Sequence, residues 1–289
     1  MQRPCVTPPL GSFAAAGFAC FLLAACGSPA GRGPSPADET ARAQNQAGTR
    51  SLASGNLTGA LAQYRSSLAV AESVENFELA GANLLNIAVV HERLGQWNES
   101  HAAADKILSA PLLYGSQTVT GAAARKAFVH LDQGDATAAL RWADAAERDC
   151  APPCSPLAAL ENLRAHIALE HGQTDKAIAH ASRAAGLSTA PAMEAELANA
   201  QRLLGRAFTR ANQFVDSAQS LTSALVIDRR LGLTARIALD LLYAGDNEMR
   251  RNEKAGARHF YERAAAVSAA AYDEPGVRAA RQRLEVLTQ

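Results

Sequence analysis

The chain has 289 residues, of which 48% are hydrophobic but only 5% aromatic, so any core is built mainly from Ala, Leu, Val and Ile. Lys and Arg together number 28 and are balanced by 28 Asp and Glu, which gives a formal net charge of zero. The absence of a basic excess argues against nucleic acid as the main partner.

The first 25 residues predict a signal peptide that is not part of the fold. Arg3 supplies a positive charge, and Phe13 to Ala25 form an apolar stretch too short to remain as a membrane-spanning helix. The stretch ends in Leu23-Ala24-Ala25-Cys26, which resembles the lipobox of bacterial lipoproteins. In that family the Cys is lipidated and becomes the first residue of the mature protein. An ordinary secretory signal with an incidental Cys26 is the alternative.

Residues 26–37 predict a flexible tether from the lipidated Cys26, because Gly, Pro, Ser and Ala predominate in them. Two or more acyl chains anchor a protein stably, whereas one chain binds a membrane only marginally. The residue after Cys26 is Gly27 and not Asp, which by the sorting rule of enteric lipoproteins favours the outer membrane. We therefore expect a lipid-anchored protein of the cell envelope, facing the periplasm from the outer membrane.

From residue 38 onward a short pattern recurs six times. Each copy has a Gly or Asn that suits a helix C-cap, where the backbone is left-handed. Residues five, nine and twelve positions later lie on one stripe of the next helix. The turn residues stand 40, 39, 38, 40 and 40 positions apart, at Gly55, Gly95, Gly134, Gly172, Asn212 and Asn252. Small residues precede these turns, at Gly48, Ala88, Ala127, Ala165, Gly205 and Gly245.

This pattern resembles the tetratricopeptide repeat, in an extended form of about 40 residues per unit. The resemblance covers residues from about 38 to 270 and implies an all-α fold, a right-handed superhelical solenoid of about six helix–turn–helix repeats. We assign 38–289 to the solenoid and expect a closing helix over about 275–289 that covers the last repeat. The family's large aromatic at the start of the first helix is mostly missing. An Ala-rich bundle with accidental periodicity is the alternative.

The repeats contain two cysteines, Cys150 and Cys154, separated by Ala-Pro-Pro. The prolines are expected to end a helix and force a turn. In an oxidising periplasm, two Cys four apart across such a turn predict a disulfide. A free thiol pair and a redox or metal role are the alternatives, and no companion His lies nearby in the sequence.

No catalytic motif is present in the sequence. It has no Gly-x-Ser-x-Gly, no P-loop, no His-Glu-x-x-His and no dinucleotide fingerprint. The seven His are scattered, so we expect no metal, no cofactor and no small-molecule substrate. An enzyme with an unrecognised site is the least favoured alternative.

The family resemblance also implies where a partner binds, because the first helices of successive units line a concave groove in that family. Transferred to this chain, the candidate partner-binding residues are Asn86, Arg93, Arg125, Phe128, Asn162, His166, Arg202, Arg206, Arg210 and Arg250. Arg202, Arg206 and Arg210 stand four apart on one helix, and their guanidinium groups are expected to attract an acidic segment or a C-terminal carboxylate.

Exposed ion pairs contribute only about 0–1 kcal/mol each to stability. Replacing these three arginines with alanine is therefore expected to weaken binding and barely change melting. A solvated face whose arginines pair with local acids is the alternative.

The function expected from the sequence is a membrane-anchored, non-catalytic scaffold or adaptor of the bacterial envelope, which binds a peptide or protein partner in its groove. A structural self-assembling repeat protein and a pilotin or assembly factor for a secretion or pilus system are the alternatives.

Overall fold

The computed structural model describes residues 35–150, 154 and 156–287. The expected signal peptide at 1–25, the lipidation site Cys26 and all but the end of the tether lie outside the described residues. The chain divides into two units, Met1–Ser35 and Pro36–Gln289, and every described helix belongs to the second.

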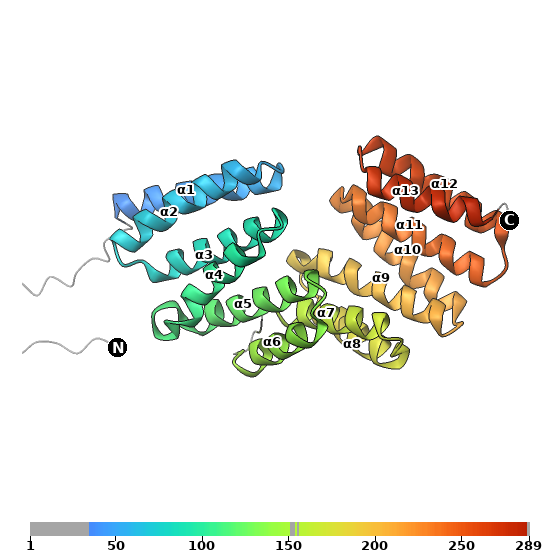
Figure 1. Ribbon diagram of the computed structural model, residues 1–289, viewed down its shortest axis with the longest axis horizontal. Coiled ribbons are helices and arrows are strands. Elements are labelled where there is room, and N and C mark those ends of the chain that lie inside the picture. Colours follow the sequence, from blue (N-terminus) through green and yellow to red (C-terminus); the bar gives the residue numbers. More distant parts are fainter. Residues whose placement is uncertain (1–34, 151–153, 155, 288–289) are drawn as a thin grey trace, which may run out of the picture. The chain divides into compact units, whose positions relative to one another are not determined.

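The described residues of this second unit form thirteen α-helices and one short 3-10 helix (Figure 1). They are α1 (Pro36–Ala53), α2 (Leu57–Ser73), α3 (Phe77–Arg93), α4 (Trp97–Leu108), α5 (Pro111–Asp132), α6 (Ala136–Arg148), α7 (Leu157–Glu170), α8 (Thr174–Leu187), η1 (Pro191–Met193), α9 (Glu194–Arg210), α10 (Phe214–Leu231), α11 (Thr234–Arg250), α12 (Lys254–Ala270) and α13 (Glu274–Val286).

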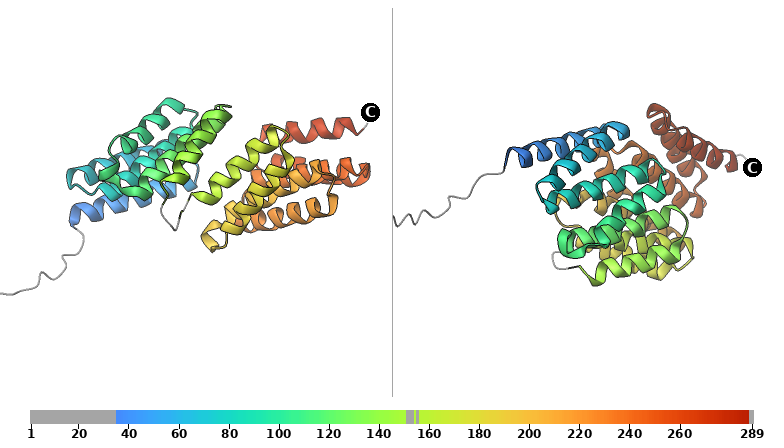
Figure 2. Two further views of the ribbon diagram at one scale, coloured as in Figure 1. Left: turned by 90° about the horizontal axis from the view of Figure 1, so that it is seen from below. Right: turned by 60° about the vertical axis from the view of Figure 1, so that its left-hand side comes forward.

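Helices α1 to α12 pack as six consecutive pairs, and α13 packs against the last pair (Figure 2). The first helices of neighbouring pairs also contact each other, as α3 does with α5 and α7 with α9. The expected all-α solenoid of about six helix–turn–helix repeats with a closing helix is therefore confirmed. Helix α1 begins two residues earlier than expected, at Pro36, because proline is tolerated in the first turn of a helix.

The turn inside each pair is the one that the recurring Gly or Asn predicts. Gly55, Gly95, Gly134 and Gly172 have φ between 69° and 79°, while Asn212 and Asn252 have φ of 61° and 64°. After each of them, the next amide donates to the carbonyl five residues earlier, as Gln96 N does to His91 O at 2.9 Å. This hydrogen bond satisfies a carbonyl that the end of the helix leaves free.

Within each pair the two helices cross at matched positions that are sixteen residues apart in the sequence. Three crossings place a glycine against a large side chain, and a Cβ on Gly245 would lie 2.3 Å from Cε1 of Tyr261. Gly48 meets Tyr64 and Gly205 meets Leu221 in the same way. The three middle pairs carry alanine on both helices, at Ala88 and Ala104, Ala127 and Ala143, and Ala165 and Ala181, all fully buried. At every crossing, the combined volume of the two side chains that face each other is thus limited by the close packing of the helices.

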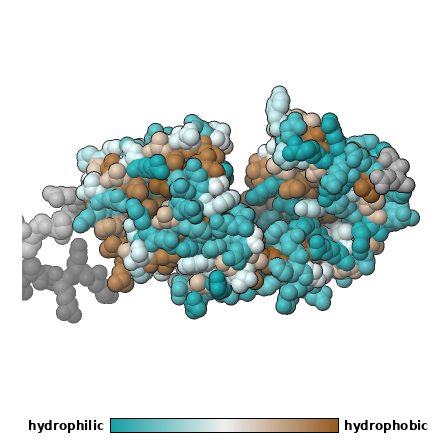
Figure 3. All heavy atoms as spheres, viewed as in Figure 1, coloured by the Kyte–Doolittle hydropathy of each residue, from teal (hydrophilic) through white to brown (hydrophobic). Residues whose placement is uncertain are grey.

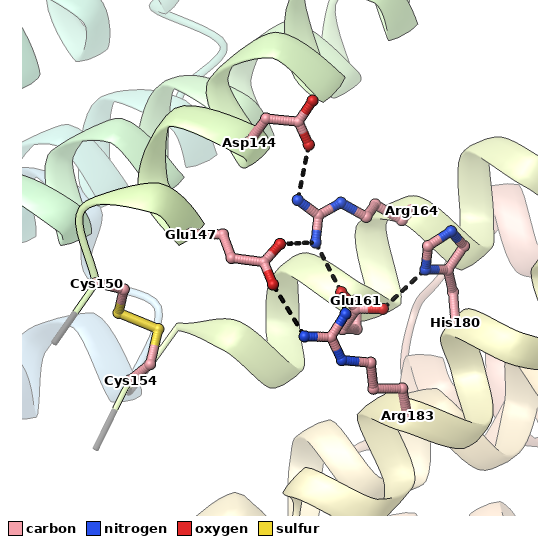
Figure 4. A network of polar contacts seen from close by, with 8 residues as sticks. All are labelled: Asp144, Glu147, Cys150, Cys154, Glu161, Arg164, His180 and Arg183. Carbon is pink, nitrogen blue, oxygen red and sulfur yellow. Dashed lines mark hydrogen bonds and ion pairs between the residues drawn. A yellow bond between two sulfur atoms is a disulfide. The ribbon is translucent and has the colours of Figure 1, made fainter. Parts of the chain in front are cut away.

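The junction between α6 and α7 differs from the others. These two helices contact each other less than any other consecutive α-helices of the described chain. The predicted disulfide lies here, with Cys150 and Cys154 joined at an S–S distance of 2.03 Å and a Cα–Cα distance of 5.4 Å. It lies at the point where the chain passes from the third pair to the fourth, and Figure 4 shows it as a yellow bond.

Ion pairs span the same junction (Figure 4). Arg164 of α7 is 8% exposed, and it contacts Glu147 of α6 at 2.7 Å and the fully buried Glu161 at 2.6 Å. Arg183 of α8 reaches Glu147 at 2.9 Å. Burial raises the pKa of Glu147, but hydrogen bonds from Arg164 and Arg183 outweigh this effect and hold it below its ordinary value. Charged groups therefore join the third and fourth repeats in addition to the apolar core, in which Leu160, Leu163 and Ile167 of α7 pack with alanines of α5 and α6.

Candidate functional site

Seven of the ten predicted groove residues line two neighbouring pockets on the first helices of the repeats. The central pocket has a volume of about 440 Å³ and contains four of them, Arg125, Phe128, Asn162 and His166. The basic pocket has a volume of about 310 Å³ and contains Arg206, Arg210 and Arg250. In the orientation of Figure 1, the space-filling view is indented between the part with α1–α5 and the part with α9–α13 (Figure 3).

The central pocket is lined by side chains from α3, α5, α7 and α9. Its charged and polar lining consists of Glu92, Arg125, Asp132, Asn162, His166, Glu196 and Asn199, with Phe128 and the apolar residues Leu131, Ala159, Leu163 and Leu203 between them. Three of these groups are carboxylates, so the pocket is richer in acceptors than in donors.

Four of the polar groups in the central pocket are already paired, and Asn162 donates to Glu196 at 2.9 Å. The guanidinium of Arg125 lies 2.8 Å from Glu92 and 5.2 Å from the centre of the Phe128 ring. Burial lowers the pKa of His166, and the nearby Arg206 lowers it further. Burial also raises the pKa of Asp132, and repulsion by Glu92 adds to this effect.

The basic pocket is lined by side chains from α9, α11 and α13. Four arginines surround it with a single carboxylate, and its lining is Arg206, Thr209, Arg210, Tyr243, Asp246, Arg250 and Arg283. This excess of guanidinium groups makes the pocket positively charged, and anions such as carboxylates are the ligands that paired guanidinium groups favour.

Local contacts hold the four arginines around the basic pocket. Arg206 lies 2.9 Å from Glu170 and its guanidinium is 4.8 Å from the centre of the Tyr243 ring. Arg283 binds both oxygens of Asp246, at 2.7 and 3.0 Å. Arg250 donates to the side chain of Asn212 at 3.0 Å, and Arg210 donates to the carbonyl of Leu169. Each of these partners leaves part of the guanidinium fork available for a ligand.

Arg202 does not line the groove, and the expectation that it binds a partner is wrong. Its side chain is 6% exposed and its Nε lies 2.7 Å from Asp240, while a terminal nitrogen contacts Asp228. Both carboxylates are buried, and burial raises the pKa of Asp240 to about 7 although Arg202 opposes this rise. Arg202 is therefore the buried counter-charge of two acids from α10 and α11.

The remaining two predicted residues line neither pocket. Asn86 is partly buried on α3, and Arg93 is exposed at the end of the same helix. Sequence reasoning missed Arg283, because the closing helix was expected only to cover the last repeat. It also missed the burial of Asp240, although its position twelve residues before the turn is occupied by buried residues in other repeats, such as Asn83 and Leu160.

None of the helices in the described residues is both long and apolar enough to cross a membrane. The same residues contain no cluster of three or more His, Cys, Asp or Glu side chains that could hold a metal ion.

Comparison with known proteins gives similarity in fold but not in sequence. No protein-family model matches the chain, and no curated protein matches it. The structure of the APC/C hetero-tetramer Cut9–Hcn1 is similar with a TM-score of 0.68 and 13% identity, over 87% of this chain and 43% of that one. This chain therefore spans less than half the length of that relative.

Two further matches cover more of the similar chain. A Rap protein in complex with Competence and Sporulation Factor gives a TM-score of 0.61 and 14% identity, over 83% of this chain and 69% of that one. BtubC from P. vanneervenii gives a TM-score of 0.59 and 14% identity, over 83% of this chain and 93% of that one. The expected likeness to tetratricopeptide-repeat proteins is confirmed for the fold.

Proposed function

We propose that this protein is a lipid-anchored, non-catalytic scaffold of the bacterial envelope that binds a peptide or protein partner through an acidic segment or a C-terminal carboxylate. The observation that carries the proposal is the basic pocket, where Arg206, Arg210, Arg250 and Arg283 surround one cavity. Repeat solenoids present extended surfaces to partners, and the similar Rap protein was solved in complex with Competence and Sporulation Factor.

The groove residues of the proposal are those that line the two pockets. In the basic pocket they are Arg206, Arg210 and Arg250, joined by Arg283. The central pocket adds Arg125, Phe128, Asn162 and His166. Arg206 and Arg210 lie four apart on α9, so their guanidinium groups reach the same ligand from one side, while Arg250 reaches it from α11.

Replacing Arg206 and Arg250 together with alanine is expected to abolish most carboxylate binding. Each charge-assisted hydrogen bond contributes about 1.5–3 kcal/mol, so the affinity should fall at least about tenfold. The measurement is capture of N-acetylated peptide pools with free C-terminal carboxylates, compared with the same pools after amidation. Wild-type protein should retain peptides that are rich in Asp and Glu or that carry the free carboxylate.

The matched control removes two arginines from outside the groove, Arg258 and Arg281, which are exposed on α12 and α13. It should bind as the wild type does. Equal capture by the wild type and by the Arg206→Ala/Arg250→Ala variant would show that the basic pocket is not the binding site.

The membrane attachment in the proposal depends on Cys26. We expect Cys26→Ser to release the protein from the membrane pellet and to abolish labelling by a palmitate analogue, because no acyl chain is then attached. The measurement is envelope fractionation of cells that express either chain, and separation of inner from outer membrane tests the expected outer-membrane location. A Cys26→Ser protein that still sediments with the membrane contradicts lipid anchoring.

A further inference from the structure

We infer that an apolar tip at the start of α5 docks on the membrane to which the protein is tethered. The apolar tip consists of Pro111, Leu112, Leu113 and Tyr114, which precede Gly115. The inference rests on the proposed lipid anchor, because that anchor brings the apolar tip to a lipid surface. It goes beyond anchoring, since it assigns the edge of the solenoid that faces the membrane.

The apolar tip is held away from the core. Leu112 is 99% exposed and Leu113 is 52% exposed, and no other large hydrophobic side chain of the described residues is as exposed as Leu112. Gly115 has φ of 74° and ψ of 160°, a conformation that is essentially confined to glycine, and it breaks α5 directly after the tip. Hydrophobic residues gather at this end of α4 and α5 (Figure 3). Covering two exposed leucines with an apolar surface is favourable.

Two contacts connect the apolar tip to the helix at which the tether ends. Tyr114 packs edge-on against Phe77 at the start of α3, with ring centres 6.3 Å apart. Asn76, the N-cap of the same helix, donates to Asp38 in the first turn of α1 at 2.7 Å. The starts of α1, α3 and α5 therefore lie side by side on one edge of the solenoid, which is the left side in Figure 1.

The tether is long enough for the apolar tip to reach the membrane. Pro36, the first residue of α1, follows Cys26 by ten positions, and an extended chain of that length spans at most about 35 Å. Packed helices lie about 8–10 Å apart, so the start of α5 is about 20 Å from the start of α1. An acyl group on Cys26 thus holds the apolar tip at high effective concentration beside the lipid. Leucines insert at the boundary between headgroups and acyl chains.

The charges around the apolar tip favour a lipid surface without net charge. Burial raises the pKa of the Tyr114 phenol, and the nearby Glu72 raises it further. Glu75 and Glu78 are also exposed, on the link before α3 and in its first turn. These acids outnumber Lys106, the basic residue in the last turn of α4. The leucines are therefore expected to bind zwitterionic lipid, whereas the acids beside them are repelled by an anionic surface.

The test uses the lipidated protein in vesicles of phosphatidylcholine and phosphatidylethanolamine. Ser109→Cys places one free thiol beside the apolar tip, because Ser109 is exposed at the end of α4 and Cys150 is joined to Cys154. A fluorophore on this thiol is expected to be quenched by spin-labelled lipid. The same fluorophore on Val215→Cys should not be quenched, since Val215 is 81% exposed at the opposite edge, where the second helices begin.

Leu112→Ser together with Leu113→Ser removes the apolar surface of the tip and leaves the core intact. Full burial of one leucine corresponds to at least about tenfold in an equilibrium constant, and half burial of two leucines to about the same. We expect this variant to shift the docking equilibrium about tenfold toward the free tip, measured as lost quenching at Ser109→Cys. Val215→Ser is the matched control and should leave the quenching unchanged. Equal melting of both variants by circular dichroism shows that they are folded.

The outcomes separate this inference from the proposed function. A protein that does not float with the vesicles lacks the anchor, which overturns both the proposed membrane attachment and the inference. A protein that floats but is quenched equally at the two labelled positions, or equally in the double serine variant, overturns the inference alone.

Two further results also contradict docking through the leucines. One is quenching that appears only after anionic phosphatidylglycerol is added to the vesicles. The other is concentration-dependent energy transfer between labelled proteins without quenching by lipid, which assigns the apolar tip to a contact with a second copy. Both results leave the basic pocket and the lipid anchor of the proposed function unaffected.

Discussion

Arg202→Ala is expected to lower the free energy of unfolding by about 3–5 kcal/mol, because it removes the cation that contacts two buried carboxylates, Asp228 and Asp240. Asp228 and Asp240 are 0% and 1% exposed, so water cannot replace the lost guanidinium without opening the packing of α9 against α10 and α11. The expectation from the sequence, that this substitution barely changes melting, applies only to exposed arginines.

The measurement is urea unfolding followed by circular dichroism, and the control is Arg258→Ala, whose exposed side chain should change stability by no more than about 0.5 kcal/mol. Arg202→Lys should fall between wild type and Arg202→Ala, since one ammonium cannot reproduce the fork that contacts two acids. If Arg202→Ala and Arg258→Ala unfold at the same urea concentration, the buried charge triad described above does not exist.

Tyr261→Ala is expected to cost about 3–5 kcal/mol, the range found when a large buried aromatic side chain is truncated. Tyr261 is 2% exposed and its ring lies directly over Gly245, so its loss leaves a cavity at the crossing of α11 and α12. Because a glycine on the opposite helix cannot move a side chain into that space, the cavity should collapse only partly.

Tyr261→Phe separates the ring from the hydroxyl, which donates to Asp246 at 2.8 Å. It should cost about 1 kcal/mol, the net contribution of one hydrogen bond. Tyr272→Ala is the control for aromatic content, since Tyr272 is 94% exposed. Thermal and chemical unfolding of the three variants test the prediction, and a Tyr261→Ala protein no less stable than Tyr272→Ala would contradict it.

The periodic features of the fold could be predicted from the sequence because they depend on local chemistry. A left-handed residue at the end of a helix favours Gly or Asn, so Gly134 and Asn212 mark their turns without knowledge of the rest of the chain. The close helix crossings likewise require small residues, as at Ala127 and Gly205. The break inside α5 at Gly115, with φ of 74° and ψ of 160°, was not predicted, because it lies outside the repeated pattern.

The site was only partly predictable, because its charges pair over long separations in sequence. Arg206 and Arg250 were identified from their positions relative to the turns, and both line the basic pocket. Arg202 shares that register, but its partners Asp228 and Asp240 lie 26 and 38 residues away and turn it into the interior. Helical spacing locates a residue on a face only approximately. The direction of its side chain also depends on the charged residues with which it pairs.

The matched crossings divide the hairpins into two types, and a helix of one type does not fit a helix of the other. Tyr261 fits over Gly245 only because that position has no side chain, whereas Ala143 meets another alanine at Ala127. Pairing α11 with α6 would leave a cavity of roughly the size of a phenol ring at the crossing. Pairing α5 with α12 would place the Tyr261 ring against the methyl group of Ala127. Although the repeats share one backbone plan, helices of the two types are not interchangeable, and recombination of this gene between hairpins of different type would preserve the protein only if whole hairpins were exchanged.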